Sequence, residues 1–144
     1  MPKPFIFLPD IAIADIAFEA RGKTLHELFE AAAQAVFETM ADVSTIAPKK
    51  TKKISLSASS LDRLLYDFLS EIIFVKDTDS LVFCTANVNV KETSKGCSLT
   101  ATLTGDTINP ETQKLGNDVK AITMHMFTLA KNKDDYTARV VIDI

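Results

Sequence analysis

The chain has 144 residues, of which 47% are hydrophobic and 24% are charged. That is the length of one average domain and the composition of a globular rather than a disordered protein. The formal net charge of −3 argues against a dedicated nucleic-acid binder, which usually has a basic face. The sequence contains no run of membrane-spanning length and no signal-peptide pattern, so we expect a cytoplasmic protein without a membrane partner.

The first part of the chain predicts two short strands and a helix. The strands are expected at residues 4–8 and 14–20, separated by a break at Pro9 and Asp10. Thr24 and Glu27 match a capping box, in which each side chain accepts a hydrogen bond from a free N–H group at the helix start. Apolar residues at helical spacing then predict a helix that ends near Asp42.

The rest of the chain predicts one further helix and several strands. A basic cluster at residues 49–53 leads into an alternating strand at 54–58. A wide apolar stripe after Ser60 predicts a buried helix that ends near Asp77. Alternation then predicts strands at 81–90, 97–104, 118–130 and 137–144. We therefore expect a single α+β domain over residues 1–144, with a mostly antiparallel sheet and two main helices on one side.

Recognised catalytic and metal-binding motifs are absent from the sequence. It has no phosphate-binding loop, no nucleophile motif and no zinc-type spacing of cysteines. Cys84 and Cys97 fall in alternating apolar runs, which fits either two buried thiols or a disulfide across a hairpin. We therefore assign no catalytic residues.

Two aspartates near the ends of the sequence are candidates for a cation site. Asp143 is followed by Ile144, and a terminal carboxylate there would place a second anion beside the first. Such a pair suits a hard cation that prefers several oxygen ligands, or else a salt bridge from Arg139, Lys120 or Arg21.

Asp15 has two readings on residue pattern alone. Alternation places it with Ala17 and Glu19, opposite Ile16 and Phe18, which is typical of a solvent-exposed strand face. The sharper reading makes Asp15 the other half of the cation site at Asp143.

The strand at 118–130 carries a lysine and a histidine. Alternation places Lys120 on the same face as Ile122, Met124 and Met126. His125 shares the opposite face with Phe127, a position typical of a hydrogen-bonded sheet residue rather than a metal ligand.

Five separated blocks of sequence resemble the archease family over nearly the whole chain. They are Ala14-Asp15, the helix start from Gly22 to Ala33, Leu64 to Glu71 followed by Asp77-Thr78, Val119-Lys120-Ala121-Ile122-Thr123 with His125, and Asp143-Ile144. Where the family commonly has His-Thr-Ala-Asp, this chain has Ala12-Ile13-Ala14-Asp15, which removes two polar groups that would support a cation.

The resemblance implies a protein cofactor rather than an enzyme. Archeases activate the RtcB-type RNA ligase of tRNA splicing and RNA repair, promoting its guanylylation and multiple turnover, so RNA would be met only indirectly. The family's divalent-cation site, described as binding Ca²⁺, maps onto Asp15, Asp143 and Ile144, with Mg²⁺ and Mn²⁺ as alternatives. Asp118, where the family usually has Glu, and Lys120 map onto residues expected to act on the ligase.

Two other functions remain open on the sequence. One is a small metal-dependent phosphoester hydrolase in which Asp15 and Asp143 hold a metal that activates water. The other is a general protein chaperone or interaction module, for which the sequence offers no obvious exposed apolar segment.

Overall fold

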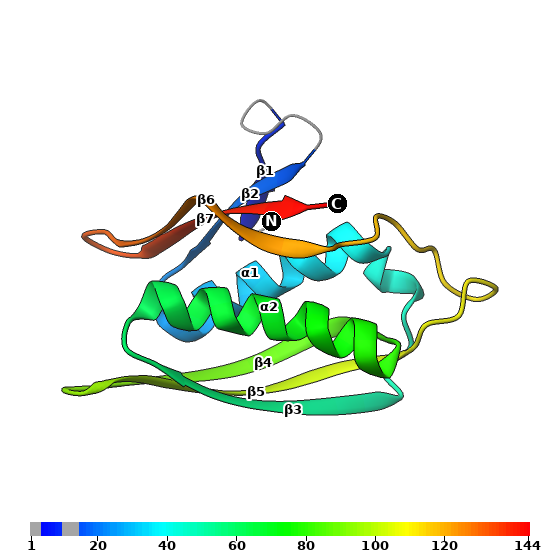
Figure 1. Cartoon of the computed structure of the whole chain (residues 1–144), viewed down its shortest axis with the longest axis horizontal. Helices are drawn as coiled ribbons and strands as arrows, with labels where there is room; N and C mark the ends of the chain where they lie inside the picture. Colours follow the sequence, from blue (N-terminus) through cyan, green and yellow to red (C-terminus); the bar gives the residue numbers. More distant parts are fainter. Residues whose placement is uncertain (1–3, 10–14) are drawn as a thin grey trace.

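The structure is a computed structural model that describes residues 4–9 and 15–144. Within these ranges, two α-helices lie between two antiparallel sheets (Figure 1). The elements are β1 (Phe5–Phe7), β2 (Ile16–Gly22), α1 (Leu25–Met40), a 3-10 turn (Val43–Thr45), β3 (Lys50–Ala58), α2 (Leu61–Asp79), β4 (Leu81–Thr93), β5 (Gly96–Thr107), β6 (Ala121–Lys131) and β7 (Tyr136–Asp143). The predicted α+β class with two main helices is confirmed.

The two sheets pack on opposite sides of the helix pair. The first sheet has the strand order β1-β2-β7-β6 and the second has β3-β5-β4. Helix α1 packs against β2 and β4, and α2 packs against β3, β5 and β6. Each sheet therefore has helices on one side and leaves its other face outward. The sequence predicts one sheet, and the structure divides its strands between two.

Aromatic side chains join the layers. The ring of Phe29 on α1 stacks on Phe68 of α2 with centroids 6.2 Å apart, and Phe37 contacts Phe83 of β4 at 5.7 Å. All four side chains are essentially inaccessible to solvent. Burying a side chain of this size contributes about 1.5–3 kcal/mol, so these rings hold the helices and sheets in a fixed relation.

The start of α1 is fixed by the predicted cap. The N–H of Glu27 donates to Oγ1 of Thr24 at 3.2 Å, and the N–H of Lys23 donates to Oε2 of Glu27 at 2.8 Å. Thr24 therefore satisfies a backbone donor of the first helical turn, and Glu27 accepts from the residue just before the cap. The expected capping pair is confirmed.

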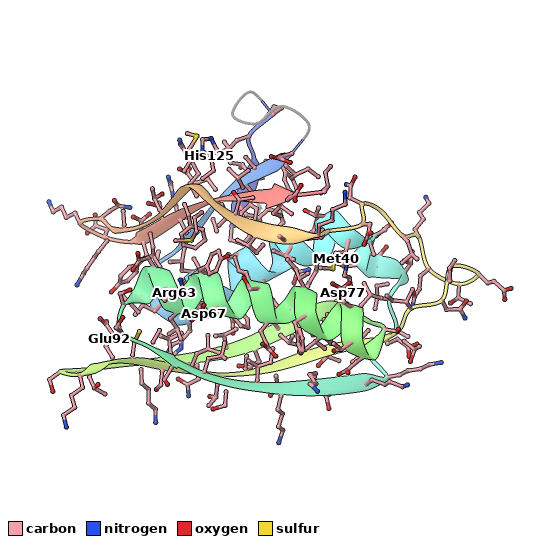
Figure 2. All side chains as sticks on the ribbon, in the orientation of Figure 1. Met40, Arg63, Asp67, Asp77, Glu92 and His125 are labelled. Carbon is pink, nitrogen blue, oxygen red and sulfur yellow. The ribbon has the colours of Figure 1, made fainter. Side chains whose placement is uncertain are left out.

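A wide bulge in β6 overturns the predicted alternation of that strand. The register with β7 shifts between Thr123 and Thr128, and Met126 has a positive φ of 57°. The ring of Phe127 turns toward the helices and lies edge-on to Tyr66 at 5.8 Å. His125 stays on the outer side of the kink (Figure 2).

The predicted faces of β6 are therefore wrong beyond Thr123. Met124 does not share the buried face of Ile122, because its side chain is 56% exposed. The strand also starts at Ala121 rather than at residue 118. A pattern of alternating residues assumes a regular strand, and an inserted bulge moves each later side chain to a new face.

The cysteines do not form the disulfide that their hairpin placement allowed. Both thiols are free. Sγ of Cys84 lies 3.4 Å from the carbonyl oxygen of Thr104, which is seven residues along β5 from Cys97. Seven strand residues span about 23 Å, far beyond disulfide reach. The reading of two separate thiols is correct, and burial is the main cause that raises the pKa of Cys97.

Candidate functional site

Asp15 and Asp143 each lie next to the last paired residues of β2 and β7, at one end of the four-stranded sheet. The paired register of β2 and β7 ends with Ile16 opposite Ile142, so the next residue on each strand is one of the two aspartates. Residues opposite each other in an antiparallel pair have Cβ atoms about 4.5–5.5 Å apart. Asp15 and Asp143 are thus carried on neighbouring strand ends, and a cation site that they share stays a prediction.

Strand β6 brings Lys120 and Ile144 to the same place. Ala121 pairs with Asp143, and the N–H of Lys120 donates to the carbonyl oxygen of Asp143 at 2.9 Å. The same register, continued by one residue, sets Lys120 opposite Ile144. Figure 1 shows this end of β7 beside the start of β6.

Asp118 is tied to the end of α2 rather than to the two aspartates. Nζ of Lys76 lies 3.0 Å from Oδ1 of Asp118 and donates to the carbonyl oxygen of Val119 at 2.8 Å. It also lies 3.1 Å from Oδ1 of Asp77. The Lys76 side chain is only 10% exposed, so this cation fixes the segment that leads into β6.

Sequence reasoning missed Lys76. It lies in the last turn of α2, outside the apolar stripe that drew attention to this helix. A lysine in the last turn complements the partial negative charge of a helix C-terminus, and this preference could have drawn attention to Lys76 from the sequence.

The ion pair shifts the pKa values of both partners. The hydrogen bond and charge of Lys76 lower the pKa of Asp118 below its ordinary value. Burial, the largest single influence on Lys76, works to lower its pKa, but the hydrogen bonds and charges of Asp118 and Asp77 outweigh burial and raise it. Both groups therefore stay charged around neutral pH.

A pocket of about 460 Å³ opens beside Asp15. Besides apolar residues of the first two strands, it is lined by polar residues that the sequence analysis did not single out, namely Glu38, Thr39 and Asn117. Asn117 belongs to the loop before β6, and its N–H donates to the carbonyl oxygen of Thr39 at 3.0 Å. The pocket thus joins the end of α1, the start of β2 and this loop.

Gly116 allows the loop to lie this close to α1. Its N–H donates to the carbonyl oxygen of Met40 at 2.6 Å. A Cβ atom at this position would lie 2.9 Å from the carbonyl oxygen of Thr39, closer than side chains tolerate. The missing side chain is therefore what lets the loop satisfy the last carbonyls of the helix.

The salt-bridge alternative finds little support around the two aspartates. Arg139 pairs with Glu19 at 3.7 Å, and Arg21 pairs with Asp135 at 3.5 Å. Among residues 4–9 and 15–144, no lysine or arginine lies within ion-pair distance of Asp15 or Asp143. Two like charges directly across a sheet repel each other unless a cation lies between them.

An unsatisfied side-chain oxygen lies nearby on the same sheet, two residues along the strands from the two aspartates. Oγ1 of Thr123 is buried and finds no hydrogen-bond partner among the described residues. Thr123 pairs with Val141, which in turn pairs with Ala17, so its row is two residues along the strands from Asp15 and Asp143. A buried hydroxyl without a partner costs free energy, so this oxygen is a further candidate donor.

The donors at this sheet end are all oxygens, which is the set that Ca²⁺ and Mg²⁺ prefer. Two carboxylates alone do not complete such a site. Within the described part of the chain, no three or more His, Cys, Asp or Glu side chains gather as a metal centre. The remaining ligands would be main-chain oxygens, Ile144 or water. The replaced residues Ala12 and Ile13 lie outside the described residues.

No helix in the described ranges is both long enough and apolar enough to cross a membrane.

The fold and the sheet end define a small α+β protein with a carboxylate pair, and comparisons identify its class. The model of the Archease protein family (MTH1598/TM1083) matches residues 6–144. Protein archease from Thermococcus kodakarensis is 36% identical over 132 residues, covering 91% of this chain and 93% of the relative. Protein archease from Methanothermobacter thermautotrophicus is 35% identical over 131 residues, with the same shares.

Solved structures agree. Protein 1598 of Methanobacterium thermoautotrophicum superposes with a TM-score of 0.84 at 33% identity, covering 99% of this chain and 100% of that one. A Thermotoga maritima protein described as an archease and possible chaperone shares the fold, with a TM-score of 0.62 at 20% identity over 92% and 93% of the two chains. The chain belongs to the archease family.

Proposed function

We propose that the chain is a protein cofactor, not an enzyme, that activates an RtcB-type RNA ligase by promoting its guanylylation and multiple turnover. The observation that supports the proposal is the pairing of Ile16 with Ile142, which are the residues next to Asp15 and Asp143. Membership in the archease family supports the class of partner.

In this proposal, Asp15, Asp143 and an oxygen of Ile144 bind one divalent cation, with Ca²⁺ as the first choice and Mg²⁺ or Mn²⁺ as alternatives. The cation offsets the repulsion between the facing carboxylates and presents a positive centre at the surface. Lys120, whose N–H binds the carbonyl oxygen of Asp143, and Asp118, which Lys76 holds on the same segment, would contact the ligase beside this centre.

The function is tested by single-turnover guanylylation of the host's own ligase, with and without this protein. We expect Asp143→Ala to abolish stimulation while urea unfolding stays cooperative. Asp134→Ala, which removes an exposed carboxylate from the β6–β7 turn, is the matched control and retains stimulation. Unchanged stimulation by Asp143→Ala contradicts the assignment of the site.

The cation is tested separately by calorimetric titration with CaCl₂, MgCl₂ and MnCl₂. Asp15→Asn and Asp143→Asn each remove one charged ligand and should weaken Ca²⁺ binding at least tenfold. Thr123→Val should also weaken it if the buried hydroxyl is a donor to the site. If that variant instead gains stability with cation affinity unchanged, Thr123 is only an unsatisfied core group.

A chaperone role is the second candidate, and exposed side chains favour it. The described residues include six large hydrophobic side chains that are exposed, namely Ile6, Phe7, Phe74, Leu115, Met124 and Met126. Suppression of aggregation of unrelated clients, lost on Met124→Ser and Met126→Ser but kept on Asp143→Ala, would support this role over ligase activation.

A further inference from the structure

The outer face of the three-stranded sheet has an unusual chemistry. Its positions are every second residue of 51–57 in β3, 85–91 in β4 and 98–104 in β5, which the strand register aligns in four rows. Of these twelve positions, eight are Ser or Thr, two are Asn and two are Lys. The alternate residues between them point into the core, so this face lies away from the helices (Figure 2).

No acidic side chain occupies the face. The chain has 19 Asp and Glu residues and a net charge of −3, yet all 19 lie elsewhere. The face therefore carries a net positive charge, although the net charge of the whole chain is negative. Two groups of alternating hydroxyls, at 51–57 and 98–104, flank each other across β3 and β5.

The two lysines of the face are available to a ligand. Lys53 and Lys91 are exposed, and neither has an ion-pair partner among residues 4–9 and 15–144. Lys52, by contrast, is held by Asp79 at 3.1 Å on the other side of the strand. Charges that the fold does not neutralise are the ones that an anionic partner can use.

The lysines bracket a diagonal across the sheet. Lys53 on β3 lies in the row of Thr102. Lys91 lies on β4, at the other side of the sheet, and it pairs with Ser98 of β5 two rows further along. Strand geometry puts their backbones about 13 Å apart along the strands and about 9.5 Å apart across them, which gives a diagonal of roughly 16 Å. Phosphates of one nucleic-acid strand repeat at intervals of about 3.4 Å along a helix axis, so this diagonal spans several of them.

A shallow hollow lies at the Lys53 end of that diagonal. It has a volume of about 460 Å³, and the polar side chains that line it are Lys53, Ser55, Asn87, Asn89, Thr100 and Thr102. Lysine, hydroxyl and amide groups of this kind supply most contacts to phosphate and sugar oxygens in nucleic-acid complexes. No aromatic ring stands on the face, so it offers nothing on which bases could stack.

We propose that this face binds the sugar-phosphate backbone of single-stranded RNA without reading its sequence. Charge complementarity carries the choice of occupant, because an acid-free face with two unpaired lysines fits a polyanion. The width of three strands accommodates one backbone rather than the two of a duplex. The hydroxyl and amide groups also match the 2′-OH groups that distinguish RNA from DNA. The surface is separate from the sheet end of Asp15 and Asp143, so it goes beyond the proposed function.

The test is fluorescence anisotropy with a labelled polyuridylate. A length of about 15 nucleotides lies within the range of site sizes that single-strand binding surfaces cover. We expect saturable binding that weakens about sevenfold between roughly 50 and 200 mM salt, as two phosphate contacts require. Polyadenylate should bind as well as polyuridylate, whereas DNA of the same sequence and duplex RNA should bind more weakly.

Charge-reversal variants locate the site. Lys53→Glu with Lys91→Glu should weaken binding at least tenfold and remove most of the salt dependence. The control is Lys114→Glu with Lys133→Glu, which changes the net charge equally at exposed positions outside the face and should leave binding unchanged. Lys53→Arg with Lys91→Arg should retain binding.

Three results would overturn the proposal. They are no saturable binding at millimolar protein, equal loss in the face variant and its control, and tighter binding of duplex RNA than of the single strand. Melting curves of each variant confirm that the exposed substitutions leave the fold intact, and ligase stimulation measured in parallel keeps this result distinct from the proposed function.

Discussion

Nδ1 of His26 accepts a hydrogen bond from the backbone N–H of Val90 at 2.9 Å. His26 lies on α1, and Val90 lies on β4, whose outer edge pairs with no strand in the part of the chain that the structure describes. One turn further along α1, Oε2 of Glu30 accepts from the N–H of Val88 at 2.8 Å. Another turn on, Nε2 of Gln34 donates to the carbonyl oxygen of Cys84 at 3.2 Å. One row of helix side chains thus satisfies the open edge of the sheet.

This row protects an edge that would otherwise recruit another strand. Replacing His26 or Glu30 with Leu leaves an N–H group without an acceptor, and we expect each change to lower the unfolding free energy by about 1–3 kcal/mol. Urea denaturation measures the loss, and size-exclusion chromatography should show soluble aggregates of the double variant.

Two controls accompany that experiment. Glu30→Gln keeps an oxygen acceptor and should cost less than Glu30→Leu. His125→Leu removes the chain's other histidine from an exposed position and should change stability by less than about 0.5 kcal/mol. A loss in His125→Leu equal to that in His26→Leu would contradict the edge-capping role.

The ion pair of Lys76 with Asp118 predicts a defined pH dependence. Because the folded-state pKa of Asp118 is lowered, its ionised form stabilises the fold above the ordinary carboxyl range. That contribution disappears as the pH falls through the lowered pKa. For Lys76 the sense is opposite: its pKa is raised, so its contribution is present below the ordinary value of 10.5 and is lost as the pH rises through the raised pKa.

Asp118→Asn should therefore be less stable than the parent protein at neutral pH, and the difference should shrink toward zero in strong acid. Urea midpoints measured from pH 7 down to about pH 2 test this. Asp134→Asn is the control, and its difference from the parent should stay small throughout. A gap for Asp118→Asn that is constant with pH would mean that the charge on Asp118 does not contribute.

Because of the bulge in β6, we expect a glycine substitution at Met126 not to destabilise the fold as glycine usually does in a strand. Met126 has a φ of 57° and is 41% exposed, so Met126→Gly relieves a left-handed backbone and loses little burial. We expect the unfolding free energy to stay level or rise by up to about 1 kcal/mol. Met124→Gly, at a neighbouring position without positive φ, should lower it by about 0.5–1 kcal/mol. Thermal melts compare the two.

Local patterns in the sequence predicted the elements well. The capping pair at Thr24 and Glu27 and the wide stripe of α2 depend on residues three or four apart, which sequence spacing reports directly. β3 starts earlier than predicted, at Lys50, because the basic cluster itself is extended and paired with β5. The lysines discourage pairing at the free edge of β3, but they do not prevent its other edge from pairing with β5.

Relations between distant residues were harder to predict. The pairing of β2 with β7, which brings the ends that carry Asp15 and Asp143 side by side, is encoded by no local pattern, and the sequence indicated it only through charge and resemblance. The bulge at Met126 has no glycine or asparagine to mark it. The polar alternation at 98–104 was visible, but the acid-free face needed all three strands in register.

The helix pair separates two outward-facing sheets, and that arrangement bears on how such proteins diverge. Side chains on either outward face can be exchanged without refitting the aromatic rings that hold the layers together. Related proteins can therefore keep the two aspartates on the four-stranded sheet while the hydroxyl-rich face of the three-stranded sheet changes in sequence, or the reverse. Comparing substitution rates on these two surfaces across many genomes would show which of them selection preserves.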